Sequence, residues 1–297
     1  MSEGAFRYHL NTDSCYFNNF LNVSAAWDDA FGEVKTPELV RQQLKNNSFS
    51  ANSITHWIRL GQNGKGVEIL SKNAFRTQPQ RLTITPGLYP DRFNNGDCYA
   101  AHTQNVRYNA LASNNRLSFL SAVVLGDIKI DPAANINVEH QTLHSDLGIS
   151  AANGSSQPIT DTEMQNNIAW TRINAGISID GSYTGERLKL NWMLPIIYRY
   201  TVIDNLLKND EKQIKGKFYF QSSLSAKYNL TPQFEANASA EFHTQTPGLS
   251  TIYTGYILQN YRSINRYDTK LFDSHGLFTS LSLSHKNILS MFLRVAA

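Results

Sequence analysis

Four tyrosines and one arginine gather in the last sixth of the sequence. They are Tyr253, Tyr256, Tyr261, Arg262 and Tyr267. Aromatic rings beside an arginine on an exposed loop can stack on a sugar or a peptide and hydrogen-bond to it. The same side chains could equally pack a long loop against its neighbours. We take these five residues as the candidate ligand-binding site, and both interpretations remain open at this point.

Other residue patterns that could support chemistry are incomplete. His140 and His144 are four positions apart, but the sequence HQTLH lacks the glutamate of HExxH, and its alternation is that of a strand. The GQNGKG stretch at Gly61 to Gly66 lacks the spacing of a phosphate loop and indicates a hairpin turn. No nucleophile elbow or pair of catalytic carboxylates is evident. The sequence therefore predicts no enzyme, no metal site and no cofactor.

The composition excludes several classes of protein. The chain has 297 residues with 27 Lys and Arg against 24 Asp and Glu, and its net charge of +3 gives no case for a nucleic-acid partner. Charged residues make up only 17%, yet the mean hydropathy is −0.37. Much of this polarity comes from 29 Asn and 27 Ser. No apolar run approaches the roughly 18 residues of a membrane helix, so a helical membrane protein is excluded.

The two cysteines and the N-terminus carry little further information. Cys15 and Cys98 are far apart, without the spacing of a zinc site or a disulfide framework. The N-terminal residues MSEGAFRYHLNTDS have neither a basic region nor an apolar core, so we expect no secretory signal. The chain is then either cytoplasmic or a piece of a larger protein.

The strongest local pattern is the alternation of apolar and polar residues with a period of two. From Phe218 to Tyr228 the even positions form one face and the odd positions the other. A polar turn at Leu230 to Gln233 follows, and the alternation resumes from Phe234 to Phe242. This pattern predicts an antiparallel hairpin with one apolar and one polar face.

Five further hairpins follow from the same alternation, so the sequence predicts about twelve strands. They span Phe6 to Ala26, Ile54 to Thr77, Asn115 to Thr142, Arg172 to Ile196, and Leu277 to Leu293 with a turn at Lys286 and Asn287. Long polar connections are expected at residues 27–53, 78–114, 145–165, 201–213 and 244–275. Short turns at one end and long loops at the other are typical of bacterial outer-membrane barrels.

The spacing of aromatic residues favours a barrel over a soluble sandwich. Phe218 and Tyr228 are ten positions apart, which at a tilt of about 40° is roughly 25 Å along a barrel axis, the height of an outward apolar band. Phe234 and Phe242 bracket the next strand, with only alanines between them on that face. A sandwich core would more often place its large side chains in the middle, since alanine buries little area.

Three segments resemble the TonB-dependent outer-membrane receptor family. The stretch Ser250 to Leu293 resembles a late barrel segment, while Ser71 to Phe93 and Asn135 to Leu147 look like a strand, an outer loop and a strand of such barrels. The resemblance covers most of the chain. Receptors of this family have a barrel of about 22 strands and an N-terminal plug. The resemblance implies about half of such a barrel, without a plug or a closing strand.

The sequence thus predicts an all-β chain in which residues 1–297 form one partial outer-membrane barrel, an open, up-and-down antiparallel half-barrel. The resemblance implies a fragment of a receptor in the outer membrane of a Gram-negative cell. Its parent would take up a nutrient with energy delivered by TonB through the missing plug. The alternative is a soluble or surface-exposed β-rich binding or adhesion module, in which the apolar faces would pack on a second sheet.

Overall fold

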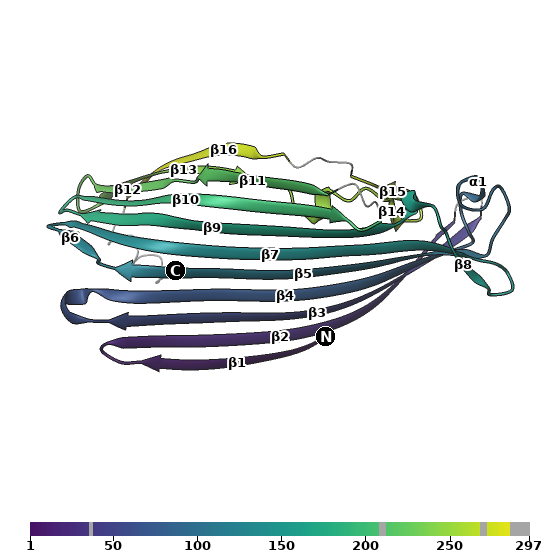
Figure 1. Ribbon diagram of the computed structural model, residues 1–297, viewed down its shortest axis with the longest axis horizontal. Helices are drawn as coiled ribbons and strands as arrows, with labels where there is room; N and C mark the ends of the chain where they lie inside the picture. Colours follow the sequence, from purple (N-terminus) through teal and green to yellow (C-terminus); the bar gives the residue numbers. More distant parts are fainter. Residues whose placement is uncertain (36–37, 208–211, 268–271, 286–297) are drawn as a thin grey trace, which may run out of the picture.

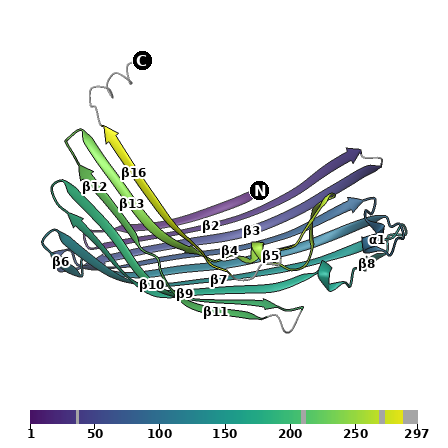
Figure 2. The same cartoon turned by 90° about the horizontal axis from the view of Figure 1, so that it is seen from above.

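The computed structural model shows one large, curved antiparallel sheet that does not close (Figures 1 and 2). It describes residues 1–35, 38–207, 212–267 and 272–285. Among these residues, no helix is long and apolar enough to span a membrane. The prediction of an all-β, open, up-and-down sheet is confirmed.

Eleven strands follow one another across the sheet, and every neighbouring pair is antiparallel. In spatial order they are β1 (Ser2–Asn11), β2 (Cys15–Lys35), β3 (Leu39–Leu60), β4 (Gly66–Thr85), β5 (Ala101–Leu120), β7 (Ile128–Ser150), β9 (Asn166–Thr184), β10 (Leu188–Asn205), β12 (Ser223–Asn229), β13 (Phe234–Gln245) and β16 (Ser274–His285). Three short partners join this path: β6 (Val123–Leu125), β8 (Ser156–Pro158) and β11 (Gln213–Phe220). The predicted strand from Ile288 to Leu293 and its turn at Lys286 and Asn287 lie outside the described residues.

The long connections lie at the end of the sheet opposite the short turns, although residues 36–38 alone join β2 to β3 at that end. The strands are also longer than the alternation predicts. Residues 27–53 were expected to form a polar loop, and this prediction is wrong. They belong to β2 and β3, which pair without a break from Cys15 with Arg59 to Lys35 with Leu39. Ladder hydrogen bonds satisfy the backbone there, so polar side chains do not end the strands. The connection expected at 78–114 likewise shrinks to residues 86–100, with the helix α1 (Pro90–Phe93).

The predicted strand through Phe218 and Tyr228 is divided in two. β11 and β12 both pair with β10 in one register, since Phe220 lies opposite Ile196 and Ser223 opposite Met193. Pairing with β10 is interrupted at residues 221–222, and β13 pairs with β12 but not with β11. The ten-residue spacing between Phe218 and Tyr228 survives this interruption, because they lie opposite Tyr198 and Leu188.

The convex face carries a continuous apolar row near the short turns. Successive register partners along this row are Leu10, Phe17, Trp57, Ile69, Leu117, Ala134, Ile177, Ile196 and Phe220. On the later strands the large apolar side chains stay open to solvent, with Ile177 exposed by 63%, Phe218 by 68% and Leu281 by 83%. No second sheet covers this face in the described part of the chain, so these strands lack the packing that a sandwich requires.

Polar residues on the convex face of the earlier strands bond to one another. Ser71 donates to Asn115 at 2.7 Å, and Ser113 donates to Asn73 at 2.7 Å. The amides of Asn73 and Asn115 donate to Ser71 and Ser113 at 3.1 and 2.9 Å. The four side chains therefore form a closed ring of hydrogen bonds. Such a ring lowers the cost of placing these groups in an apolar medium.

The concave face is polar and carries partly buried ion pairs. Arg172 donates to both oxygens of Glu139 at 2.8 Å, and Arg116 pairs with Asp180. Lys227 lies 2.6 Å from Glu235. A face of this kind is typical of the interior of a large outer-membrane barrel.

Arginine substitutions at adjacent positions of β13 test this assignment of faces. Ala238 is exposed on the convex side between Ala226 and Leu281, and Ser239 points to the concave side. We expect Ala238→Arg to lower the free energy of unfolding in a bilayer by about 2 to 4 kcal/mol, whereas Ser239→Arg should change it little. Denaturant titration of the chain in lipid vesicles measures both. Equal losses at the two positions would contradict the alternation.

Candidate functional site

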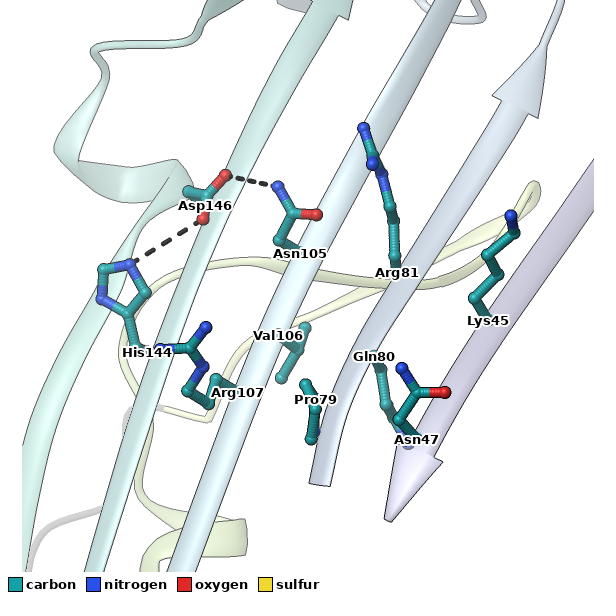
Figure 3. Close-up of a pocket in the computed structure, with 10 residues that line it drawn as sticks. All are labelled: Lys45, Asn47, Pro79, Gln80, Arg81, Asn105, Val106, Arg107, His144 and Asp146. Carbon is teal, nitrogen blue, oxygen red and sulfur yellow. Dashed lines mark hydrogen bonds and ion pairs between the residues drawn. The ribbon is translucent and has the colours of Figure 1, made fainter. Parts of the chain in front are cut away.

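Two hollows lie on opposite faces of the sheet. One is on the convex face and is lined by residues of β3, β4, β5 and β7 (Figure 3). The other lies on the concave face, between the sheet and the segment that connects β13 to β16. The second contains a residue of the tyrosine cluster, so it is the candidate ligand site.

The connecting segment folds back over the concave face (Figure 2). We call its described part, residues 246–267, the inner segment. It contains the short helix η3 (Leu249–Thr251) and the hairpin formed by β14 (Ile257–Asn260) and β15 (Ser263–Asn265). The inner segment crosses above strands that come more than 100 residues earlier in the chain.

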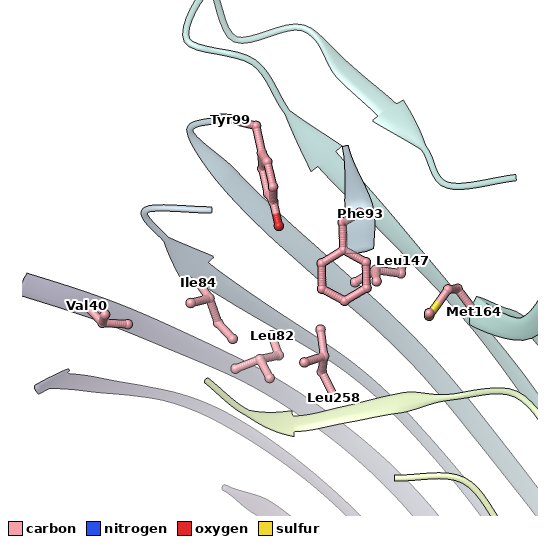
Figure 4. Close-up of a cluster of buried hydrophobic side chains, with 8 residues drawn as sticks. All are labelled: Val40, Leu82, Ile84, Phe93, Tyr99, Leu147, Met164 and Leu258. Carbon is pink, nitrogen blue, oxygen red and sulfur yellow. The ribbon is translucent and has the colours of Figure 1, made fainter. Parts of the chain in front are cut away.

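Two apolar clusters attach the inner segment to the sheet. Leu249, Ile252, Tyr253 and Ile257 of the inner segment pack against Leu143, Ile168, Trp170 and Ile203 of the sheet. Leu258 packs into a second cluster with Val40, Leu82, Ile84, Phe93, Tyr99, Leu147 and Met164 (Figure 4). Fully burying one such side chain contributes about 1.5 to 3 kcal/mol, so the inner segment is held firmly.

A pair of hydrogen bonds between Asn166 and Gly255 fixes the middle of the inner segment. The Asn166 amide donates to the Gly255 carbonyl at 3.0 Å, and the Gly255 N–H donates back to Asn166 at 2.8 Å. Asn166 also donates to Ser145 at 2.8 Å. Only glycine fits at position 255, because an added Cβ would lie 2.1 Å from the carbonyl oxygen of Gln165.

A buried carboxylate anchors the two ends of the connecting segment. Asp273 accepts hydrogen bonds from Tyr219 at 2.8 Å and Thr246 at 2.9 Å, and it lies 2.7 Å from Lys215. Burial alone would raise the pKa of Asp273, but these three donors lower it to about 2. Arg199 extends the network by donating to Thr246 at 2.6 Å. Residues 246 and 273 are thus held together although the chain between them is long.

The cavity beneath the inner segment has a volume of about 530 Å³ and contains no charged side chain in its wall. Its polar residues are Gln80, Gln104, Tyr108, Ser250, Tyr253 and Gln259. The rest of the wall is aliphatic, from Leu44, Leu82, Val106, Leu143, Leu249, Ile257 and Leu258. Phenol and amide groups on an aliphatic surface can bind a neutral ligand that combines hydroxyl or amide groups with apolar parts.

The structure separates the five residues of the tyrosine cluster. Only Tyr253 lines the cavity, where burial and then the nearby Tyr267 raise its pKa. The Tyr253 and Tyr267 rings meet edge to face at 5.1 Å. Tyr256 lies between two guanidinium groups, with Arg92 at 5.2 Å and Arg266 at 4.7 Å from its ring.

Tyr261 and Arg262 lie at the turn of the inner hairpin. Arg262 stacks on the neighbouring ring of Tyr261 at 4.9 Å. The Tyr261 carbonyl accepts a hydrogen bond from Tyr89 at 3.2 Å. Most of the cluster therefore packs the inner segment against its neighbours, and a role of these residues in binding a ligand remains a prediction.

Sequence reasoning missed most of the cavity wall. Gln80, Gln104 and Tyr108 lie within residues 78–114, which were expected to form a polar connection but belong to β4 and β5 at these positions. The only sign of these wall residues in the sequence is that they are polar at positions that share a strand face with the apolar Leu82 and Val106. That face becomes the wall of a cavity only because a segment about 150 residues later covers it.

The other candidates from the sequence, His140, His144 and the GQNGKG stretch, do not form a common site. His140 shares a hydrogen bond with Thr171 at 2.9 Å, and His144 lies 3.8 Å from Asp146. No group of three or more His, Cys, Asp or Glu residues that could hold a metal ion occurs among the described residues. The GQNGKG stretch forms the turn between β3 and β4, with positive φ at Asn63 and Gly64.

Comparisons with solved structures return outer-membrane proteins. The copper transporter OprC matches over 96% of this chain and 48% of its own length, with 10% identity and a TM-score of 0.48. The ferric yersiniabactin uptake receptor FyuA from Yersinia pestis matches over 96% and 50%, with 9% identity and a TM-score of 0.42. The outer membrane protease OmpT from Escherichia coli matches over 92% and 96%, with 10% identity and a TM-score of 0.31.

OprC and FyuA are TonB-dependent receptors, the family that the sequence segments resemble. The chain spans about half the length of these two structures. No protein-family model matches the sequence, and no curated protein matches it.

Removing the amide of Asn166 tests how the inner segment is held. Asn166→Ala leaves the buried N–H and C=O of Gly255 without partners, which should destabilise the docked segment by about 1 to 3 kcal/mol. Hydrogen exchange at Gly255 should accelerate accordingly. Asn137→Ala is the control. Asn137 lies on the concave face as Asn166 does, but in β7, and its substitution should leave this exchange unchanged. An unaltered rate in Asn166→Ala would show that the apolar clusters suffice.

The buried phenol of Tyr99 leads us to expect that the protein loses stability at alkaline pH. Burial raises the pKa of Tyr99 to about 12 from 10.0, and its hydroxyl donates to the Leu88 carbonyl. The folded state therefore favours the neutral phenol, and its contribution is complete below pH 10 and lost as the pH rises toward 12. We expect Tyr99→Phe to remove this part of the pH dependence in an unfolding titration. The same slope in both proteins would contradict the assignment.

Proposed function

We propose that this chain forms part of an outer-membrane transport barrel, with its convex face in lipid and its concave face toward a ligand pathway. The observation that carries the proposal is the opposition of the two faces on one open sheet. Apolar side chains remain uncovered on the convex side, while ion pairs and amides line the concave side. A soluble protein would need a covering layer over the convex face.

We propose further that the chain binds a nutrient in the cavity beneath the inner segment. The wall lacks charge and combines Tyr108, Tyr253 and three glutamines with aliphatic groups. A sugar or a short peptide of neutral character suits this chemistry better than a metal chelate or an anion does. The inner segment covers one side of this cavity, and the sheet forms the other side.

The resemblance to TonB-dependent receptors supplies the proposed partners. In such a receptor, a plug within the barrel would receive energy from the TonB complex, and the chain would contribute part of the surrounding wall. The concave face offers rows of polar side chains for such an occupant. Binding and passage of a ligand, rather than catalysis, is the proposed role.

The two native cysteines test the placement in the membrane. Cys15 lies beside the short turn between β1 and β2, whereas Cys98 is exposed in the long connection between β4 and β5. On whole cells that carry the chain in its outer membrane, a membrane-impermeant maleimide should label Cys98 and spare Cys15. Mass spectrometry of peptides around each cysteine measures the labelling.

Variants that lack both native cysteines provide the control. Asp91→Cys, in the connection at the end where Cys98 lies, should be labelled from outside, and Pro232→Cys, in a short turn, should not. Both should react after the cells are broken. Labelling of Pro232→Cys on intact cells would overturn the proposed orientation, and labelling of neither position would argue against insertion.

A further inference from the structure

Four basic side chains from four neighbouring strands surround the hollow on the convex face. Lys45, Arg81, Arg107 and His144 belong to β3, β4, β5 and β7 in turn (Figure 3). Lys45 is the register partner of Arg81, and Arg107 is the partner of His144. All four are exposed. The hollow has a volume of about 450 Å³.

A proline produces the hollow by interrupting the ladder beneath it. Pro79 of β4 pairs with Arg107 of β5, but the pairing of β4 with β3 stops at Gln80 and resumes at Thr77. Proline has no N–H to donate to β3, so the two strands separate locally. Asn47, which lies on the same face as Lys45, adds a further hydrogen-bonding group to the wall.

The protein neutralises only part of the positive charge at this site. Asp146 is the only acid in the wall, and it already accepts a hydrogen bond from Asn105 at 2.9 Å and lies 3.8 Å from His144. Lys45 is 3.9 Å from Asp29. Arg81 and Arg107 have neither an ion pair nor a side-chain hydrogen bond within the described part of the chain. Two arginines therefore present unused donors to an external anion.

The distance of the hollow from the apolar row, measured along the strands, indicates that the external anion is a lipid headgroup. Arg107 lies ten positions along β5 from Leu117, a member of the apolar row near the short turns. Ten residues at a tilt of about 40° correspond to roughly 25 Å along the barrel axis, the height of the apolar band. Phe49 and Phe75 lie just below the basic groups, with their rings 6.3 Å apart. The hollow is thus at the level where acyl chains give way to headgroups.

We propose that this hollow binds a lipid whose headgroup carries two phosphates, with its acyl chains against the convex face. Three gaps between strands separate Lys45 from His144, a span of roughly 14 Å, which is too wide for one phosphate to reach both side chains. The inference rests on the proposed insertion of the convex face in lipid. It adds a binding site outside the ligand pathway.

The test uses the whole chain inserted into phosphatidylcholine vesicles that contain a small fraction of lipid A, a disaccharide lipid with two phosphates. Vesicle flotation and protease protection first show whether the chain is inserted. The protein is then extracted in a neutral detergent, and the lipid A retained by each chain is measured by mass spectrometry. Arg81→Gln with Arg107→Gln should lower retention by about 25-fold, since one such cation near a charged lipid surface changes affinity about fivefold.

The matched control removes the same charge from the opposite face of the sheet. Lys72→Gln with Arg76→Gln alters two exposed residues of β4 that share the concave side with Ala74, and it should leave lipid A retention unchanged. Equal losses in both double variants would overturn the site, because retention would then depend only on net charge. Inorganic pyrophosphate in excess should not displace lipid A, and displacement would show that the hollow selects a soluble phosphate.

The experiment separates failure of the site from failure of the proposed function. A chain that inserts but retains lipid A equally in the arginine variant and the parent would refute the site alone. A chain that does not enter the vesicles would refute both, since the convex face would then not meet lipid. Insertion with arginine-dependent retention supports both.

Discussion

The backbone hydrogen-bond ladder is the constraint on which the rest of this structure depends. Each strand inside the sheet satisfies its N–H and C=O groups through its neighbours on both sides, so the side chains are free to differ completely between the two faces. This explains how strands as polar as β3, with its run of Asn, Ser and Gln, can reach 22 residues. The ladder is interrupted at two places. At Pro79 the interruption leaves the hollow on the convex face, and at residues 221–222 it separates β11 from β12.

The polar concave face provides attachment points for the inner segment. Asn166, Gln104 and Arg199 project from three different strands and bond to Gly255, Leu258 and Thr246. These contacts are far apart in sequence, and each compensates a polar group that the segment would otherwise bury unpaired. The segment therefore divides the concave face into a covered part, with the neutral cavity, and an open part with ion pairs.

Local alternation was enough to predict the architecture, because a period of two follows directly from strand geometry. The hairpins around Thr184 to Glu186 and Leu230 to Gln233 are found where the pattern places them. The long extensions of β2 and β3 were missed because Asp28, Asp29 and several Asn residues were read as loop residues. In fact, ladder pairing and cross-strand hydrogen bonds such as Gln43 to Asp29 make them compatible with a strand. The cavity could not be predicted, since its wall joins residues about 150 positions apart.

The direction of the edge strands shows what would be needed to complete a barrel. The path of the described residues contains eleven strands in antiparallel succession, so β1 and β16 run in the same direction. Direct pairing of these two edges would be parallel, unlike every other pair in the sheet. An odd number of additional strands between them restores antiparallel pairing throughout. Among the described residues, Ser2–Asn11 and Ser274–His285 each pair on one side only. In lipid, where no water can satisfy the other side, a further pairing partner for each is a physical requirement.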